Sequence, residues 1–312
     1  MLDGWQPGQT VAGYRLHKSI GRGAHGEVYL AESPAGGPMV ALKLALLPTG
    51  TAAAAWRSSF LGAADVARRL VHPDIVAVHG AGIDGRMAWL AMEFVPGGDL
   101  SRYTQPSRLL PEPVVLGLAL RMALALGHAH GQGVVHRDLK PANVLVHLPG
   151  NVLKLADFGI AHAPDSAQTA TGIVPGTPAY MAPELLAGSR PTRHTDHYAL
   201  GVMLFQLLSG RLPYESSSMG ELLRQVASNP APDLRSVAPR VHPATAALVA
   251  RLLAKRPGDR PPDGRALVAA LHLQPGQFKR VGRRGRPHPQ RCGGQPHCQA
   301  GPATRAPQAP TQ

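Results

Sequence analysis

Three short polar motifs in a fixed order constrain this chain more than any bulk property does. His136–Asn143 reads His-Arg-Asp-Leu-Lys-Pro-Ala-Asn, 157–159 reads Asp-Phe-Gly, and 182–184 reads Ala-Pro-Glu. Each motif alone can arise by chance. Their occurrence in this order is far more constraining, because a glycine-rich segment and a lysine in an apolar strand also precede them.

The upstream glycine-rich segment is Ile20–Val28, which contains the pattern GxGxxG. Taken alone the pattern is weak, because glycines also serve ordinary turns. A dinucleotide-binding fold would place a helix directly after the glycines, whereas Glu27–Ala31 predicts a strand. A strand–loop–strand hairpin can lie over phosphate groups, because residues without Cβ let the backbone approach the oxygens.

Lys43 ends the apolar run that begins at Val40, and only the head of its side chain is free to act. One interpretation is a surface lysine whose stem covers an edge strand. Its position downstream of the glycines favours the other interpretation, a contact with phosphate.

Residues 14–273 resemble the protein kinase family, because the glycine loop, the strand lysine and the three motifs match its signature in order. The lysine two residues after Asp138, Lys140, resembles the pattern of the bacterial eukaryotic-like serine/threonine kinases. The resemblance implies an α+β bilobal fold with a small strand-rich N-lobe containing one main helix, and a larger helical C-lobe. The expected parts are an N-terminal segment (1–13), a kinase domain (14–274, with lobes 14–95 and 96–274) and a tail (275–312).

Hydrophobic periodicity agrees with a strand-rich unit followed by a helical one. The helical patterns are 52–70, 114–129, 197–209, 220–228 and 244–254. The apolar content of 44% suffices for a sizeable core, and the aromatic content of 4% means that Ala, Leu and Val must fill it. The longest strongly apolar stretch is identified as Tyr198–Leu208, which is too short to span a bilayer, so no membrane span is predicted. No signal peptide is evident at the N-terminus.

The resemblance assigns the chemistry of phosphoryl transfer to a few side chains. Asp138 would orient the substrate hydroxyl and accept its proton, and Lys140 would neutralise charge on the γ-phosphate. Lys43 would hold the α- and β-phosphates. Asn143 and Asp157 supply hard oxygen ligands suited to Mg²⁺.

The implied ATP site extends from the glycine loop to the hinge between the lobes. By resemblance, the Glu93 carbonyl and the backbone of Val95 would face adenine, with Met92 as gatekeeper; the alternative is simply a strand that ends there. The predicted cofactor-binding residues are Ile20, Gly21, Gly23, Gly26, Val28, Ala41, Lys43, Met92, Glu93, Val95, Asn143 and Asp157.

The polar stretch between the second and third motifs resembles an activation loop. Thr169 and Thr171 are candidate phosphosites, and Arg137 offers a charge partner for a phosphate; the alternative is an ordinary flexible loop. Thr177 matches the threonine of the substrate-binding turn.

Three further residues match structural positions of the family. Asp196 resembles the buried aspartate that anchors the catalytic loop, and Arg260 matches the arginine that pairs with Glu184.

One departure from the family concerns the N-lobe helix. Kinases pair the strand lysine with a glutamate on this helix, but alignment on His72-Pro73 places Ala63 there, and no Glu occurs between Glu32 and Glu93. Asp65 is the nearest acid, yet two residues along a helix rotate by about 200°, to the opposite face. Lys43 is therefore expected to take Asp157 or ATP as its partner.

The C-terminal segment 275–312 differs in composition from everything before it. It supplies seven of the 13 net positive charges and carries no Asp or Glu. Rich in Pro, Gln, Gly and Arg, it is predicted to be disordered. Cys292 and Cys298 fit no common zinc spacing, and nucleic-acid binding by the tail is not favoured over a solvated tail. Without a disulfide framework, a cytoplasmic location is expected.

The favoured function is a protein kinase that uses ATP and Mg²⁺ to phosphorylate Ser or Thr of proteins, itself included through self-association. A kinase-fold binding module with little or no catalysis is the alternative that Ala63 favours. A kinase of small-molecule hydroxyls is disfavoured by the peptide-binding segment from Gly176 to Glu184.

Overall fold

The structure is a computed structural model that describes residues 5–23, 26–158 and 178–273. These residues lie within one compact unit, Met1–Gln277. Thr169, Thr171, Thr177 and the tail 275–312 lie outside the described residues.

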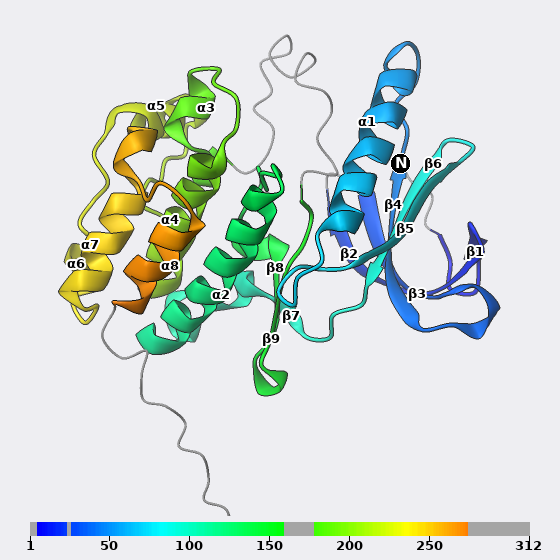
Figure 1. Ribbon diagram of the computed structural model, residues 1–312, viewed down its shortest axis with the longest axis horizontal. Helices are drawn as coiled ribbons and strands as arrows, with labels where there is room; N and C mark the ends of the chain where they lie inside the picture. The colour runs from blue at the N-terminus through cyan, green and yellow to red at the C-terminus, as the bar shows by residue number, and fades with distance from the viewer. Residues whose placement is uncertain (1–4, 24–25, 159–177, 274–312) are drawn as a thin grey trace, which may run out of the picture. The chain divides into compact units, whose positions relative to one another are not determined.

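The N-terminal part of the unit is a six-stranded antiparallel sheet with one helix against it (Figure 1). The strand order is β1-β2-β3-β4-β6-β5. The bounds are β1 Thr10–Val11, β2 Tyr14–Gly23, β3 Gly26–Glu32, β4 Met39–Leu46, β5 Val78–Asp84, β6 Met87–Glu93 and α1 Ala52–Arg69. The sheet thus begins at Thr10, within the segment that the sequence analysis placed before the domain.

The two faces of this sheet bury different sets of residues, because successive side chains of a strand alternate in direction. Leu42 and Leu44 of β4 belong to an apolar cluster with Leu16 and Tyr29. Ala41 of β4 belongs to a second cluster, which includes residues of α1. Lys43, two residues after Ala41, therefore projects from the face that α1 covers.

A three-stranded antiparallel sheet follows, made of β7 Gly98–Asp99, β8 Val144–His147 and β9 Val152–Leu155. The end of β9 is joined to the segment after α1 by a parallel bridge between Leu155 and Ile75. The motif that starts at Asp157 therefore begins two residues beyond this junction.

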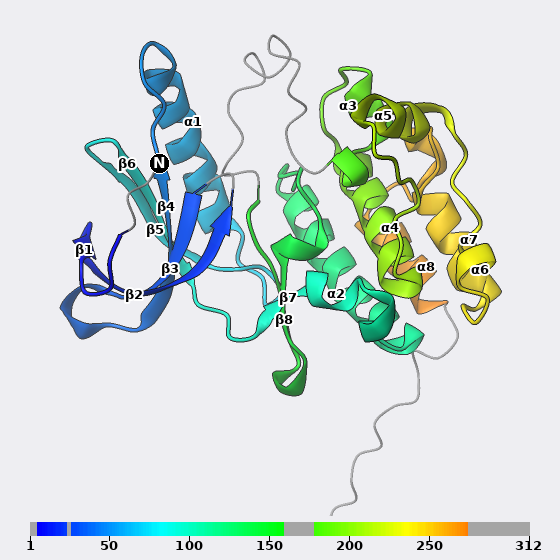
Figure 2. The ribbon, with the colours of Figure 1, turned by 180° about the vertical axis from the view of Figure 1, so that it is seen from behind.

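The remaining helices build the second part around α4 Arg193–Ser209, which is buried almost throughout from Thr195 to Leu208. Thr192 and Thr195 form a capping box at its start, and Gly210, with φ 76°, ends it. Figure 2 shows α4 between α2 and α7. The other bounds are α2 Glu112–Gly131, α3 Pro183–Leu186, α5 Met219–Ser228, α6 Leu234–Val237, α7 Pro243–Leu252 and α8 Gly264–His272.

The five helices expected from periodicity are present, and three short ones were not anticipated. The helix predicted from 197 begins four residues earlier, at Arg193, because Thr192 supplies the cap. The helices α3, α6 and α8 were missed because they are short, and α8 follows two prolines closely.

Among the described residues, α2 is the helix that is long and apolar enough to cross a membrane by length and composition. This apolar helix is longer than Tyr198–Leu208, the stretch that was expected to be the longest. Half of its apolar window is buried against the rest of the unit, as in the core helix of a folded domain.

Candidate active site

The segment from His136 to Asn143 forms a compact hydrogen-bonded loop around Asp138. Lys140 Nζ donates to Asp138 Oδ2 at 2.7 Å. Asn143 Nδ2 donates to the same oxygen at 3.0 Å and to the Asp138 carbonyl at 2.7 Å. The Asp138 side chain keeps 15% of its surface exposed, so it can reach a substrate while its orientation is fixed.

Asp196, at the buried start of α4, anchors the backbone of this loop. Its carboxylate accepts from the backbone amides of His136 at 2.9 Å and Arg137 at 3.0 Å, and lies 2.7 Å from His130 Nε2. Arg137 has φ 71°, which a non-glycine residue adopts only where surrounding contacts support it. Burial opposes ionisation of Asp196, yet the hydrogen bonds from His130 and the backbone keep the pKa of its carboxyl below the usual value.

Asp157 faces Lys43 from the other part of the unit. Lys43 Nζ donates to Asp157 Oδ1 at 2.8 Å, and the lysine side chain is only 13% exposed. Asp157 also has a positive φ, 61°. Ala156 N donates to the Asn143 carbonyl at 2.9 Å, which ties this segment to the loop around Asp138. One connected set of contacts therefore brings Lys43, Asp157, Asn143 and Asp138 into a single site.

The helix α1 offers Lys43 no carboxylate. Ala63 is partly buried against the apolar cluster between α1 and the sheet. Asp65 is exposed, on the far side of the helix. The structure thus has the register that the sequence analysis expected, with Lys43 on Asp157.

The glycines of Ile20–Val28 are not equivalent. A Cβ on Gly26, which has φ 121°, would lie 2.1 Å from the Leu44 carbonyl oxygen, so the protein itself requires glycine there. A Cβ on Gly21 would meet Val28 at ordinary contact distance, and one on Gly23 would meet nothing within 4 Å. These two positions leave the space that a phosphate group above the strands would need.

A buried carboxylate that the sequence analysis did not single out supports this hairpin. Glu27 Oε1 accepts from Ser19 Oγ at 2.7 Å, and Glu27 also pairs with Arg22 near the loop tip. The hydrogen bond from Ser19, together with those from Tyr29 and Arg22, outweighs desolvation and holds the pKa of Glu27 below its usual value.

Four of the predicted cofactor-binding residues gather in the cluster that α1 covers. Ala41 and Met92 belong to it, with Val28 and Val95 packed at its edge. Leu145 of β8 and Ala156 join from the C-terminal part, and the sequence analysis missed both. Neither residue belongs to a motif that points to nucleotide binding, so only their position in the fold identifies them. Ile20 is 41% exposed and lies outside these clusters.

The hinge carboxylate has a partner that no sequence pattern indicated. Lys154 Nζ of β9 donates to Glu93 Oε2 at 2.7 Å, and Ala77 N donates to the same oxygen at 3.2 Å. The side chain of Glu93 therefore ties the end of β6 to β9 and to the residue that precedes β5.

The oxygen donors of the site fit Mg²⁺ better than a softer metal. Asn143 donates through Nδ2, which leaves its Oδ1 for a cation, and Asp157 adds a carboxylate. Within the described residues no three His, Cys, Asp or Glu side chains converge on a metal position. An ion here would complete its shell with water and phosphate oxygens, which is how Mg²⁺ is usually held.

Glu184, the last residue of the third motif, forms an ion pair with Arg260. Two parallel bonds of 2.8 Å join the guanidinium to the carboxylate, and the arginine side chain is fully buried. Arg260 also donates to the carbonyls of His194, Ala254 and Lys255. The pair therefore ties α3 to the loop before α8.

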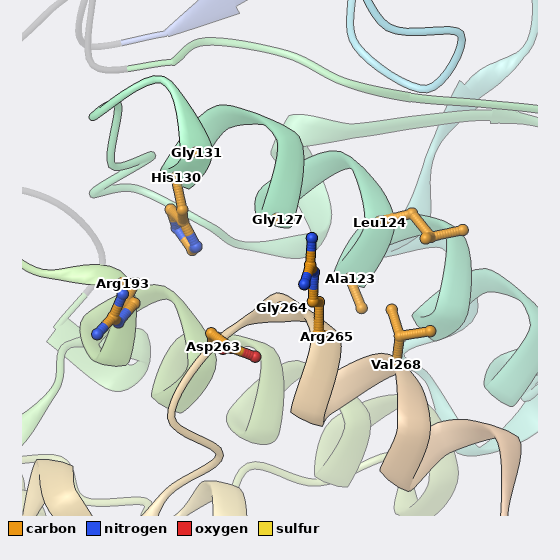
Figure 3. A pocket seen from close by; sticks show the side chains of 10 residues that line it. All are labelled: Ala123, Leu124, Gly127, His130, Gly131, Arg193, Asp263, Gly264, Arg265 and Val268. Carbon is orange, nitrogen blue, oxygen red and sulfur yellow. The ribbon is translucent and has the colours of Figure 1, made fainter.

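A second hollow, of about 380 Å³, lies behind the catalytic loop between α2, the start of α4 and α8 (Figure 3). His130 and Arg193 lie toward one end, and Leu124 and Val268 toward the other. One of its lining residues, His130, also contacts Asp196, whereas Lys43 and Asp157 are not among the lining residues.

The fold has two parts, and its site combines the Lys43–Asp157 pair with a loop that Asp196 supports. These features define a class of protein: the chain belongs to the protein kinase family. The sequence profile of the protein kinase domain matches residues 14–270.

Proteins named as bacterial serine/threonine-protein kinases are similar to this chain. It is 37% identical over 287 residues to serine/threonine-protein kinase pkn3 of Myxococcus xanthus, covering 88% of this chain and 52% of that protein. It is 39% identical over 258 residues to PknJ of Mycobacterium tuberculosis, covering 80% and 43%. The chain thus spans about half the length of these relatives. The crystal structure of the Mycobacterium tuberculosis PknI kinase domain matches with a TM-score of 0.67 and 32% identity, covering 86% of this chain and 98% of that one.

Proposed function

We propose that this chain is an ATP- and Mg²⁺-dependent protein kinase that phosphorylates Ser or Thr side chains of proteins. The observation that carries the proposal is a chain of hydrogen bonds, completed by one from Ala156 N to the Asn143 carbonyl, that assembles five polar residues in one site: Lys43, Asp157, Asn143, Asp138 and Lys140. Relatives named as serine/threonine kinases support it.

The proposed roles follow from the charge that develops during phosphoryl transfer. Lys43 binds the α- and β-phosphates, and Asn143 and Asp157 hold the cation when it is bound. Mg²⁺ would neutralise charge on the phosphates. Asp138 orients the substrate hydroxyl and takes its proton, and Lys140, already 2.7 Å from Asp138, is placed to meet the transferred phosphoryl group.

The alternative of a binding module rested on Ala63. This alternative is less well supported, because Asp157 nevertheless holds Lys43 at the site and because the polar residues that phosphoryl transfer needs are retained. We further propose autophosphorylation on Thr169 and Thr171, with self-association during that step, and a cytoplasmic location. These proposals rest on sequence, since the two threonines lie outside the described residues.

Incubation with γ-labelled ATP and Mg²⁺, followed by phosphopeptide mapping, tests the proposal. Wild-type protein should label itself on Ser or Thr, with Thr169 and Thr171 prominent, and chelation of Mg²⁺ should stop the reaction. Asp138→Asn should lose about 10²-fold or more, because the general base contributes roughly 10²–10⁴-fold. Equal labelling by wild type and Asp138→Asn would refute the assignment of the site.

A further inference from the structure

The inner face of α1 presents small apolar side chains toward the active site. Its buried and partly buried residues include Ala63, Ala64 and Ala67, and none of these three offers a charge or a hydrogen-bonding side chain. In kinases a glutamate on this helix normally holds the strand lysine. Some other contact must therefore set the position of α1 relative to Lys43 and Asp157.

The segment directly after α1 makes such a contact with the strand that leads to Asp157. Val76 N donates to the Leu155 carbonyl at 2.9 Å, and Leu155 N donates to the Asp74 carbonyl at 2.8 Å. Leu155 is the last residue of β9, two residues before Asp157. A shift of the segment from His72 to Val76 would therefore be transmitted to Asp157.

An ion pair fixes this segment on the C-terminal part of the unit. The Asp74 side chain is 9% exposed, and both Nε and Nη2 of Arg121 donate to its Oδ1, the former at 3.0 Å. Arg121 lies on α2 and also donates through Nη1 to the Asn151 carbonyl at 2.9 Å, in the turn between β8 and β9. One guanidinium thus joins α2, the β8–β9 turn and the segment after α1.

We propose that Arg121 and Asp74 are positioning residues for phosphoryl transfer. Through the two backbone bonds to Leu155, their ion pair fixes α1 and the approach of Asp157 to Lys43. The pair thereby takes over the task that a glutamate at position 63 would perform. This inference rests on the proposed kinase function.

The decisive experiment compares the pair in two backgrounds. The double variant Asp74→Asn/Arg121→Gln removes both charges together, so no uncompensated charge is left buried. In the natural background it should lower kcat about tenfold and weaken ATP·Mg²⁺ binding about fivefold. Combined with Ala63→Glu, the same double change should cost less than about threefold in either quantity, because a carboxylate on α1 then holds Lys43 directly.

The matched control is Glu221→Gln/Arg224→Gln, which removes an exposed ion pair on α5. It should leave both quantities unchanged in both backgrounds. Circular dichroism and thermal unfolding establish that each variant is folded. ATP·Mg²⁺ affinity is measured by calorimetry on the full chain and does not require turnover. If the wild-type chain binds nucleotide but transfers no phosphate, the proposed function fails, while the effect of the ion pair on affinity can still be tested.

Two results would overturn the inference. Equal losses of affinity with Ala63 and with Glu at position 63 would show that the ion pair only supports folding. No loss in the natural background would show that α1 is positioned by other contacts.

Discussion

At the scale of single residues, Ala63 stands on α1, the helix on which kinases carry a glutamate that pairs with the strand lysine, and it offers Lys43 no carboxylate. Lys43 depends on Asp157, a residue that is also proposed to hold Mg²⁺. When nucleotide and cation bind, the same carboxylate must serve both the cation and the lysine. A partner for Lys43 on α1 would remove this competition.

Ala63→Glu is therefore expected to match or raise autophosphorylation, by up to about tenfold, which corresponds to about 1.4 kcal/mol of barrier. The rate should be measured at fixed, subsaturating ATP. Asp65→Ala is the matched control, since Asp65 is exposed, and it should change the rate little. If Asp65→Ala silenced a folded enzyme, Asp65 would be the partner of Lys43 and the register of α1 would be wrong.

At the scale of the elements, the start of α4 buries two ionisable side chains, Asp196 and His197. His197 Nδ1 lies 3.0 Å from the Pro261 carbonyl, and its ring packs near those of His130 and His194. Burial, reinforced by the neighbouring His130, lowers the pKa of His197 from 6.5 to about 4. The folded protein therefore keeps this imidazole neutral at pH values where the unfolded chain would protonate it.

The sign of the pH effect follows from that difference. Between pH 6.5 and about 4 the unfolded chain binds the proton more readily, so stability falls as the pH falls, by roughly 3 kcal/mol across the window. His197→Asn, which can still donate to the Pro261 carbonyl, should show a smaller loss of the free energy of unfolding between pH 7 and pH 5 in urea titrations. His79→Asn, at an exposed position, should behave as wild type. A pH dependence unchanged by His197→Asn would contradict the assignment.

For the molecule as a whole, the buried pair of Arg260 and Glu184 links parts of the chain that are far apart in sequence. Its guanidinium also bonds carbonyls on α4 and after α7, so one side chain joins α3, α4 and the loop before α8. The pair stabilises the folded unit without touching Asp138 or Lys43.

Arg260→Leu should lower the free energy of unfolding by about 3–5 kcal/mol, because Glu184 would be left as an uncompensated buried charge. That is a large part of the 5–15 kcal/mol typical of a whole domain. Chemical denaturation measures the loss. The matched control is Arg224→Leu, at an exposed position of α5, for which no measurable change is expected. A melting curve that did not move for Arg260→Leu would rule out this structural role.

The sequence by itself determined the fold class, the family and the polar residues of the site. Asp138, Asn143, Asp157 and Lys43 stand in motifs whose order and spacing are specific, and the periodicity of α1 already placed Asp65 away from Ala63. Such features are local along the chain, and sequence displays them directly.

Some of the residues that meet across the fold were revealed only by the tertiary structure. Nothing near Arg121 in sequence points to Asp74, 47 residues away, and nothing near Lys154 points to Glu93. Leu145 and Ala156 are ordinary apolar residues in the sequence, and only packing brings them against the cluster that contains Ala41. Pairings of this kind depend on how helices and sheets are placed in three dimensions, and a single sequence carries no periodicity or motif that encodes that placement.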